Sequence, residues 1–214
     1  MATEGGPEAV TVELRDVGKR FVRQWVLEGL SATFRPGTTT GVRGSNGSGK
    51  STLLRILAGQ LRPSRGTARF LSPTARLLPP GQVYRRVGWT APYLELPEEL
   101  TIREYLEFHY GFKGLLAGYD TPGVLERIGL AGVRNRKLVD CSSGMRQRVL
   151  LAGALYSRSA LLLLDEPSLT LDEASAAWFT DELRAVAPGR TVVVASNDAR
   201  DLVTCGHTLE LPTP

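Results

Sequence analysis

Cysteine and histidine are scarce in this sequence, and long apolar runs are absent. Its two cysteines, Cys141 and Cys205, are too few for a disulfide framework and lack the CxxC spacing of a metal site. No apolar stretch approaches the roughly 18 to 20 residues that a bilayer crossing needs. The first ten residues, MATEGGPEAV, have neither a basic start nor an apolar signal segment. These absences predict a protein without redox chemistry that stays in a reducing cytosol, where it is made.

Charge of one sign is not gathered at any point along the chain. The sequence has 26 Lys and Arg against 22 Asp and Glu, a net charge of +4, but its basic residues are scattered rather than collected into one run. We therefore expect no nucleic acid partner. The two histidines, His109 and His207, have no neighbours with metal-ligand spacing, and we expect both to be surface residues. With 42% hydrophobic residues over 214 positions, the chain has the composition of one folded catalytic domain.

Short apolar segments separated by helical ones indicate an α/β fold. Residues 161–167 (LLLLDEP) and 191–196 (TVVVAS) are near-continuous apolar runs of the kind that forms strands buried on both faces of a parallel sheet. Residues 10–17 alternate apolar and polar side chains, as in a half-buried strand near the N-terminus. Further strands are expected as a pair within 25–34 and singly at 38–44, 67–71 and 87–90.

The pattern becomes helical between residues 93 and 141, which predicts a helical subdomain inserted into the sheet domain. Thr101 is followed three residues later by Glu104, as a capping box at the start of a helix requires. Residues 121–130 (TPGVLERIGL) have the pattern of a second, short helix. After the insert, the serine pair at 142–143 is expected to cap a further helix.

A phosphate-binding loop is predicted between an expected strand and an expected helix. Glycines let successive backbone N–H groups converge on phosphate oxygens, and the helix N-terminus adds the positive end of its dipole. Lys50 is expected to reach the β- and γ-phosphates, and the Ser51 hydroxyl to ligate Mg²⁺. On the order of one chain in a hundred would contain a glycine-rich turn that matches this pattern by accident. The segment that fits GxxxxGK[ST] is Gly44-Ser45-Asn46-Gly47-Ser48-Gly49-Lys50-Ser51.

Two acids follow the most apolar run of the sequence. Asp165 and Glu166 come directly after Leu164, and ligands bind at the carboxyl ends of the strands in open parallel sheets. The phosphate-binding loop begins at the same edge. We therefore expect Asp165 to hold Mg²⁺, directly or through water, and Glu166 to orient and deprotonate the attacking water. An acidic loop after a core strand is ordinary in isolation; the loop upstream favours the functional interpretation.

Over residues 10–210 the chain resembles the nucleotide-binding subunits of ATP-binding cassette (ABC) transporters. The resemblance implies a single ATP-binding domain over 1–214. Its fold is expected to be α/β: a P-loop NTPase core with a mainly parallel sheet, an N-terminal antiparallel β-subdomain and the inserted α-helical subdomain at 93–141. The segments that resemble the family's phosphate loop, signature segment, acidic strand and following loop are GSNGSGKST (44–52), CSSGMRQRV (141–149), LLLLDEPS (161–168) and SLTLD (168–172).

The resemblance also implies the ligands, ATP and Mg²⁺, and a second copy of the chain. In the family, two subunits form a head-to-tail dimer in which each ATP lies between the phosphate loop of one and the signature segment of the other. Ser142 and Gly144 are therefore expected to touch the γ-phosphate across the interface, although a serine before a helix is by itself an ordinary N-cap. Phe21 is expected to stack on adenine in place of the usual tyrosine, with a core phenylalanine as the alternative. The expected ATP-binding residues are Gly44, Ser45, Asn46, Gly47, Ser48, Gly49, Lys50, Ser51, Thr52, Phe21, Ser142 and Gly144.

Three further departures from the family pattern concern the mechanism. The signature has Met145 where the family usually has a polar residue, a form similar to that of export-type members. Neither Ala91 nor Pro92 is the glutamine that usually couples Mg²⁺ and water to the transport subunit. Asn197 stands where a histidine usually contacts the γ-phosphate; its amide can donate one hydrogen bond but cannot carry a proton. The residues expected to be catalytic are Glu166, Lys50 and Asn197.

From the resemblance we expect an ATP-hydrolysing subunit that powers a permease on a separate chain, peripheral on the inner face of the cell membrane. The helical insert would carry the permease contact, at a groove near residues 91–96. Export is favoured over import, because the compact length and the segment SSGMRQR resemble exporter-type subunits, including the haem-exporter ATPase of cytochrome c maturation. Two alternatives remain. One is a soluble family member acting on ribosomes or DNA, which usually has two cassettes or a long coiled-coil insertion. The other is a nucleotide-binding regulatory subunit with little hydrolysis, against which Glu166 argues.

Overall fold

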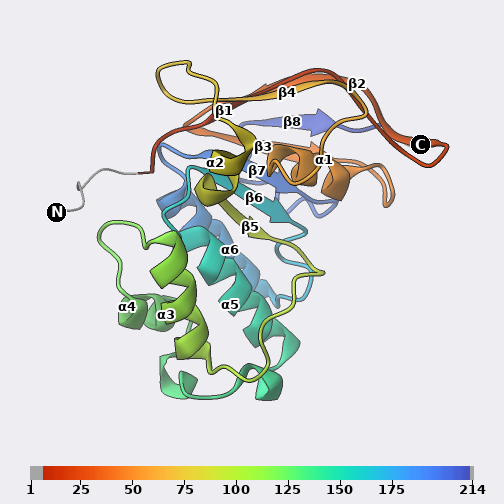
Figure 1. The fold of residues 1–214 in the computed structure, drawn as a ribbon. Helices are drawn as coiled ribbons and strands as arrows, with labels where there is room; N and C mark the ends of the chain where they lie inside the picture. The colour runs from red at the N-terminus through yellow and green to blue at the C-terminus, as the bar shows by residue number, and fades with distance from the viewer. Residues whose placement is uncertain (1–6, 213–214) are drawn as a thin grey trace.

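The computed structural model describes residues 7–212 and contains two sheets and a group of helices (Figure 1). The strands are β1 (Thr11–Phe21), β2 (Gln24–Phe34), β3 (Thr38–Arg43), β4 (Arg65–Leu71), β5 (Val87–Thr90), β6 (Leu161–Asp165), β7 (Thr191–Ala195) and β8 (His207–Glu210). The α-helices are α1 (Lys50–Leu57), α2 (Pro80–Val83), α3 (Ile102–Lys113), α4 (Thr121–Arg127), α5 (Ser143–Tyr156) and α6 (Glu173–Val186). None of the helices formed by the described residues is long and apolar enough to cross a membrane. The expectation about a signal segment concerns residues 1–10, of which 1–6 lie outside the described residues.

The larger sheet has five parallel strands in the order β5-β6-β7-β3-β8. β6 and β7 consist wholly of buried residues and pair in register, with Leu163 opposite Val193. Burying each of these side chains stabilises the fold by about 1.5–3 kcal/mol. The carboxyl ends of β3, β6 and β7 meet at one edge, and the phosphate loop and the acidic pair leave the sheet there. The parallel sheet predicted from the apolar runs is confirmed.

The smaller sheet is antiparallel, with the order β2-β1-β4, and lies above the parallel sheet in the view of Figure 1. The prediction of a strand pair within residues 25–34 is wrong, because the whole segment belongs to β2, which pairs with β1 along its length. Gly29 does not make a turn. It has a φ of 63° close to Asp16, whose φ is 50°, where the register shifts between Leu14 and Val17. In one type of β-bulge a glycine adopts this left-handed conformation, and here Gly29 lies at a register shift inside the strand and does not end it.

The helical segment between β5 and α5 contains α3 and α4, which Figure 1 shows at the opposite end of the molecule from the antiparallel sheet. The capping box is confirmed: Thr101 Oγ1 accepts the Glu104 N–H at 3.2 Å, and Glu104 Oε2 accepts the Thr101 N–H at 2.9 Å. α5 begins after Ser142, whose Oγ accepts the Met145 N–H at 3.3 Å. Buried side chains of α3 and α5 form one continuous cluster with those of β6 and β7. The helices therefore extend the core of the parallel sheet.

His109 is half-buried, so its prediction as a surface residue is wrong. Its ring lies 5.7 Å from the Tyr105 ring and 5.9 Å from the Tyr110 ring, and burial lowers the pKa of its imidazole. Gly153 on α5 leaves room for the ring, at 3.6 Å from the place of its missing Cβ. The spacing of residues along α3 could not predict that Gly153, on a different helix, lies next to the His109 ring. His207 is exposed, as predicted.

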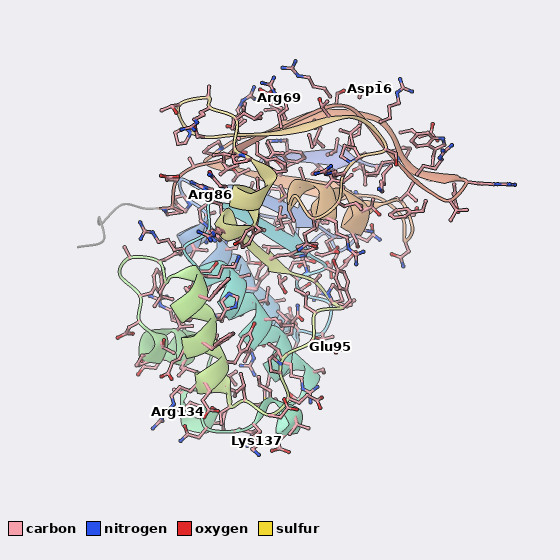
Figure 2. All side chains as sticks on the ribbon, in the orientation of Figure 1. Asp16, Arg69, Arg86, Glu95, Arg134 and Lys137 are labelled. Atoms are coloured by element: carbon pink, nitrogen blue, oxygen red, sulfur yellow. The ribbon has the colours of Figure 1, made fainter. Side chains whose placement is uncertain are left out.

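Charged side chains are distributed over the whole surface, in agreement with their scatter in the sequence. Figure 2 shows Asp16 and Arg69 at the antiparallel sheet and Arg134 and Lys137 at the far end of the helical segment. Within residues 7–212, three or more His, Cys, Asp or Glu side chains nowhere gather into a metal-binding group.

Candidate nucleotide-binding site

The loop between β3 and α1 owes its shape to glycines. Gly47 and Gly49 have φ values of 86° and 96°, which other residues rarely adopt. A Cβ at Gly49 would also lie 2.8 Å from Leu27 Cδ2 and 2.9 Å from a backbone carbonyl of β2. The loop closes on itself where the Ser48 N–H donates to the Ser45 carbonyl at 3.0 Å. The glycine positions of the predicted phosphate loop are therefore required by its backbone.

A cavity of about 350 Å³ opens between this loop, the first turn of α1 and the end of β6. α1 begins without a side-chain cap and without an acidic residue in its first turn. Its free N–H groups and the positive end of its dipole are thus available to an anion. The cavity is lined by Val26, Ser45, Asn46, Gly47, Gly49, Lys50, Ser51, Thr52, Asp165 and Glu166.

Lys50 joins the start of the loop to the acidic pair. Its Nζ donates to the Gly44 carbonyl at 2.7 Å and lies 3.4 Å from Glu166 Oε1. The Lys50 side chain is only 7% exposed, so water and salt screen its charge little. A largely buried ammonium group in the wall of the cavity attracts an anion bound there.

Asp165 has the surroundings of a cation ligand. It is 2% exposed, and its Oδ2 has no hydrogen-bond partner among the described residues. The Ser51 hydroxyl hydrogen-bonds the carboxyl group, while burial raises the pKa of Asp165. A buried carboxylate oxygen without a partner is costly. A hard cation such as Mg²⁺, which prefers carboxylate and hydroxyl oxygens, fits these two residues.

Glu166 has a strained backbone held by neighbouring loops. Its φ is 45°, in the left-handed region, and such conformations persist only when the surroundings fix them. The Glu166 N–H donates to the Ala195 carbonyl at 2.8 Å, and its Oε2 accepts the Ser196 hydroxyl at 2.9 Å. With Oε1 close to Lys50, the carboxylate lies in the cavity wall between β6 and β7.

Asn197 also reaches the phosphate loop. It is exposed in the turn after β7, and its Nδ2 donates to Asn46 Oδ1 at 3.2 Å. Because Asn46 lines the cavity, the Asn197 amide lies at the cavity mouth. The structure thus brings together the loop residues, Lys50, the acidic pair and Asn197.

The family follows from a comparison with known proteins. A family model described as ABC transporter matches residues 27–169, more than half of the chain, and this range includes the phosphate loop, the signature segment and the acidic pair. The chain belongs to the ABC transporter family. It is an ATP-binding domain of that family, as the resemblance predicted.

Two relatives and one solved structure extend the comparison over nearly the whole ABC domain. An uncharacterized ABC transporter ATP-binding protein, YybJ of Bacillus subtilis (strain 168), is 30% identical over 202 residues, 94% of this chain and 92% of that protein. The cytochrome c biogenesis ATP-binding export protein CcmA of Sodalis glossinidius (strain morsitans) is 34% identical over 151 residues, 71% of each chain. A dimeric ATP-binding cassette in a post-hydrolysis state, bound to ADP and Pi, matches with a TM-score of 0.79 at 25% identity over 94% of both chains. The predicted fold class is confirmed.

The signature segment of this ABC domain does not line the cavity of its own chain. Ser142 and Ser143 are exposed at the start of α5, and Gly144 is half-buried. The first turn of α5 has no acidic residue, so this second helix N-terminus also favours an anion. Within one chain these residues therefore do not reach the cavity.

Phe21 and residues 91–92 differ in what the structure says of them. The Phe21 side chain is 46% exposed at the end of β1, which excludes the core alternative, with Lys19 Nζ 5.2 Å from its ring centre. The cavity reaches Val26 but not Phe21, and adenine stacking stays a prediction. Ala91 is fully buried, and its methyl side chain offers no polar group in place of the usual glutamine.

Sequence reasoning missed three buried polar residues of this ABC site. Gln147 on α5 donates through Nε2 to the Pro167 carbonyl at 2.7 Å, directly after Glu166. Ser196 donates to Glu166, and Asp201, five residues later in the same turn, is also buried. A polar residue at a buried position of an apolar pattern was the available signal for Gln147. For Ser196 and Asp201 only the folded loops bring the partners together.

Proposed function

We propose that the chain binds Mg²⁺-ATP in the cavity and hydrolyses it, with Glu166 as the general base. The observation that carries the proposal is the Glu166 carboxylate, fixed in a strained backbone conformation beside Lys50 and the phosphate loop. A general base must lie within reach of the proton that it removes. Glu166 is the partly exposed acid of the pair, whereas Asp165 is buried.

Binding would use the backbone more than side chains. The N–H groups of residues 44–52 and the N-terminus of α1 receive the phosphates, and Lys50 exchanges its contacts with Gly44 and Glu166 for phosphate oxygens. Ser51 and Asp165 would hold Mg²⁺, which when bound neutralises charge that develops on the phosphates. Once Lys50 has moved to the phosphates, Glu166 Oε1 is free to accept the proton of a water molecule.

A second copy of the chain would complete each site. Ser142 and Gly144 of that copy would supply hydroxyl and N–H donors to the γ-phosphate. The exposure of Ser142 at the start of α5 in one chain supports this role. The dimeric cassette that shares the fold supports the same arrangement. Asn197 would donate one hydrogen bond to the phosphate from the cavity mouth, in place of its bond to Asn46.

Transport would be driven through a permease on a separate chain, at the inner face of the membrane. The helical insert at 93–141 would carry the contact, next to a cavity of about 210 Å³ between β5 and α3. Trp89, His109 and Lys113 are among its lining residues, and it adjoins the predicted groove at 91–96. The name of the CcmA relative, an ATP-binding export protein, supports export.

Hydrolysis is tested by steady-state phosphate release with Mg²⁺-ATP, comparing the parent protein with Glu166→Gln. The glutamine fills the same volume but accepts no proton, so turnover should fall at least about a hundredfold while ATP affinity stays within about twofold. Turnover in the variant within twofold of the parent would show that Glu166 is not the base.

A regulatory subunit that binds ATP without hydrolysing it is the second candidate, favoured by Asn197 and by the absence of a glutamine at residues 91–92. Phosphate release by the parent no faster than by Glu166→Gln, even with its permease present, would replace hydrolysis by this function. Purification of the tagged chain from membranes tests the permease: an integral-membrane protein should accompany it. Recovery with ribosomes or DNA instead would favour the third alternative.

A further inference from the structure

One short helix, α1, connects two cavities. Its first residues, Lys50 and Ser51, line the nucleotide cavity. Two residues just after its end, Ala58 and Gln60, line the cavity between β5 and α3. The apolar side chains of α1 are buried in the core of the parallel sheet, which holds the helix as one rigid element. α1 is therefore a physical connection between the nucleotide site and the surface proposed for the permease.

Arg55 is the cation on the exposed side of this helix. It follows Ser51 by four residues, and side chains at that spacing lie on the same face of a helix, with Cβ atoms about 5–6 Å apart. Among residues 7–212 no acidic side chain forms a salt bridge with Arg55. Burial raises the pKa of Asp165 in the cavity wall, and the charge of Arg55 acts in the opposite direction. Its guanidinium group thus lies within electrostatic reach of the nucleotide cavity.

Tyr93 holds this guanidinium group. Arg55 Cζ lies 4.8 Å from the centre of the Tyr93 ring, and Arg55 Nε donates to the Tyr93 hydroxyl at 3.4 Å. The Tyr93 ring in turn meets the Trp89 ring edge-on, with 6.3 Å between the ring centres. Trp89 lines the cavity between β5 and α3, and Tyr93 belongs to the predicted permease groove at 91–96. Because Tyr93 is 45% exposed, its ring can leave Arg55 without opening the core.

We propose that Arg55 is shared between Tyr93 and the phosphates of bound Mg²⁺-ATP, so that the ring and the nucleotide compete for one guanidinium group. An exposed cation–π contact is weak, equivalent to about a two- to fivefold change in an equilibrium constant. The phosphates carry several negative charges, and Arg55 has no carboxylate partner that would hold it back. The inference rests on the proposed binding of Mg²⁺-ATP in the cavity, but not on its hydrolysis.

Competition for one cation makes the two sites reciprocal. When the nucleotide draws Arg55 away, Tyr93 and the segment around it lose a contact. When a permease segment takes up the Tyr93 ring, Arg55 becomes free for the phosphates. Linkage requires the same factor in both directions. The groove at 91–96 would thus respond to nucleotide through Tyr93, although neither Ala91 nor Pro92 offers a polar side chain.

A contact that only stabilised the fold would give a different result. Tyr93→Ala would then leave the affinity for Mg²⁺-ATP unchanged or lower it. Competition predicts the opposite sign: Tyr93→Ala should raise the affinity about two- to fivefold, because it removes the group that holds Arg55. Arg55→Ala should lower the affinity by at least about twofold. In the double variant the loss of Tyr93 should have no further effect, because no cation is left to release.

The test measures the dissociation constant of Mg²⁺-ATP by isothermal titration calorimetry in a Glu166→Gln/Gly144→Asp background. The first change prevents turnover, and the second places a negative charge on the signature segment, so that binding to a single chain is measured. The variants are Tyr93→Ala, Arg55→Ala and the double variant, each also unfolded thermally. Hydrogen exchange of peptides that cover 91–96 gives a second measurement. Mg²⁺-ATP should accelerate it a few-fold in the background chain and leave it unchanged in Arg55→Ala.

Tyr84 and Arg85 form a matched control pair. Arg85 Nε donates to the Tyr84 hydroxyl at 3.0 Å, and Arg85 Cζ lies 5.7 Å from the centre of the Tyr84 ring, which is also 45% exposed. Both residues precede β5 and lie outside the nucleotide cavity. Tyr84→Ala and Arg85→Ala should therefore leave the affinity for Mg²⁺-ATP unchanged. They remove the same kinds of side chain and the same charge as the test variants.

The outcomes separate this inference from the proposed function. An affinity that is unchanged or lower in Tyr93→Ala, or an equal gain when Arg55 is already alanine, would overturn the inference while leaving nucleotide binding intact. Slower exchange of 91–96 with Mg²⁺-ATP, or the same acceleration in Arg55→Ala, would overturn it as well. A background chain that does not bind Mg²⁺-ATP at all would overturn both the inference and the proposed function.

Discussion

Two parts of the chain are proposed to meet the same γ-phosphate, and they differ in how far one chain completes them. Around Glu166, side chains from three loops are already joined: Lys50 from the phosphate loop, Glu166 from the end of β6 and Ser196 from the end of β7. At the signature segment, Ser142 is exposed, and among residues 7–212 its Oγ accepts only the Met145 N–H of its own helix. In the proposed site, one chain therefore supplies an assembled chemical half, the side chains around Glu166. It presents the recognition half, the signature segment at Ser142, outward.

The two halves are still coupled within the chain. Gln147, one turn along α5 from Gly144, donates to the Pro167 carbonyl at 2.7 Å and is 6% exposed. Pro167 follows Glu166 directly. A displacement of the start of α5 would thus reach the residue next to the base through a short buried contact. Variants in each half can therefore test the two halves separately, and a variant at Gln147 can test the contact between them.

The largest expected effect comes from breaking the two halves in different chains. Lys50→Ala deletes a charge-assisted phosphate contact, and Gly144→Asp places a negative charge at the outward helix terminus; each alone should reduce phosphate release at least about a hundredfold. Mixed in equal amounts, they should recover roughly a quarter of the parental activity, because half of the dimers then hold one intact site out of two.

Lys113→Ala is the matched control for the lysine. Lys113 Nζ also donates to backbone carbonyls, of Tyr84 and Val87, but lies outside the nucleotide cavity. It should keep the parental rate when assayed without a permease. Full activity of Gly144→Asp alone, or no recovery on mixing, would mean that the signature segment does not act on a second chain.

The next largest effect is expected at Asn197, which hydrogen-bonds Asn46 of the phosphate loop. Its amide would contribute one hydrogen bond to a charged phosphate, and losing such a bond costs about 1.5 to 3 kcal/mol. Asn197→Ala should therefore lower phosphate release roughly ten- to a hundredfold, whereas Asn197→His should change it modestly in either direction. Rates are compared with the Glu166→Gln background. An unchanged rate in Asn197→Ala would mean that the Asn197 amide bonds Asn46 and makes no contact with the phosphate during hydrolysis.

Sequence could predict the half of the site that is local in the chain. The phosphate loop and the acidic pair are continuous segments whose glycines and buried strand carry their own signals, and the structure places both at one cavity. The Ser196–Glu166 bond joins the turns that follow two different strands, and the Gln147–Pro167 bond joins α5 to the turn after β6, so no spacing could predict them. The prediction of a strand pair within 25–34 was wrong for the same reason, because the pairing of this whole segment with β1 is not local in the chain.

A smaller effect is expected when the coupling between the halves is removed. Gln147→Leu leaves the buried Pro167 carbonyl without its donor, which should cost about 1 to 3 kcal/mol of stability and lower Tm by roughly 2 to 12 °C. Turnover should fall less than tenfold, because both halves keep their own groups. Thermal unfolding and phosphate release measure the two effects. Gln82→Leu, at an exposed position of α2, is the control; a Gln147 variant as stable as that control would show that the bond is dispensable.

The smallest expected effect is the protection of Cys141 from maleimide labelling when the dimer forms. Cys141 directly precedes Ser142 of the signature segment. Its Sγ lies 3.3 Å from the Lys137 carbonyl and its side chain is 7% exposed. Burial raises the pKa of this thiol, so less thiolate is present at neutral pH than in a free cysteine, and maleimide labelling should be slow and should accelerate as pH rises.

Mg²⁺-ATP added to Glu166→Gln, which accumulates dimers, should slow the labelling of Cys141 by a further few-fold, because the partner covers the start of α5. Cys205 supplies an internal control: burial raises its pKa to about 11, and it belongs to the segment between β7 and β8 rather than to the signature segment, so ATP should leave its slow labelling unchanged. Peptide mapping resolves the two sites in one sample. If sedimentation shows ATP-dependent dimers while Cys141 labels at the rate seen without ATP, the interface lies elsewhere, and the outward half of the site has another partner.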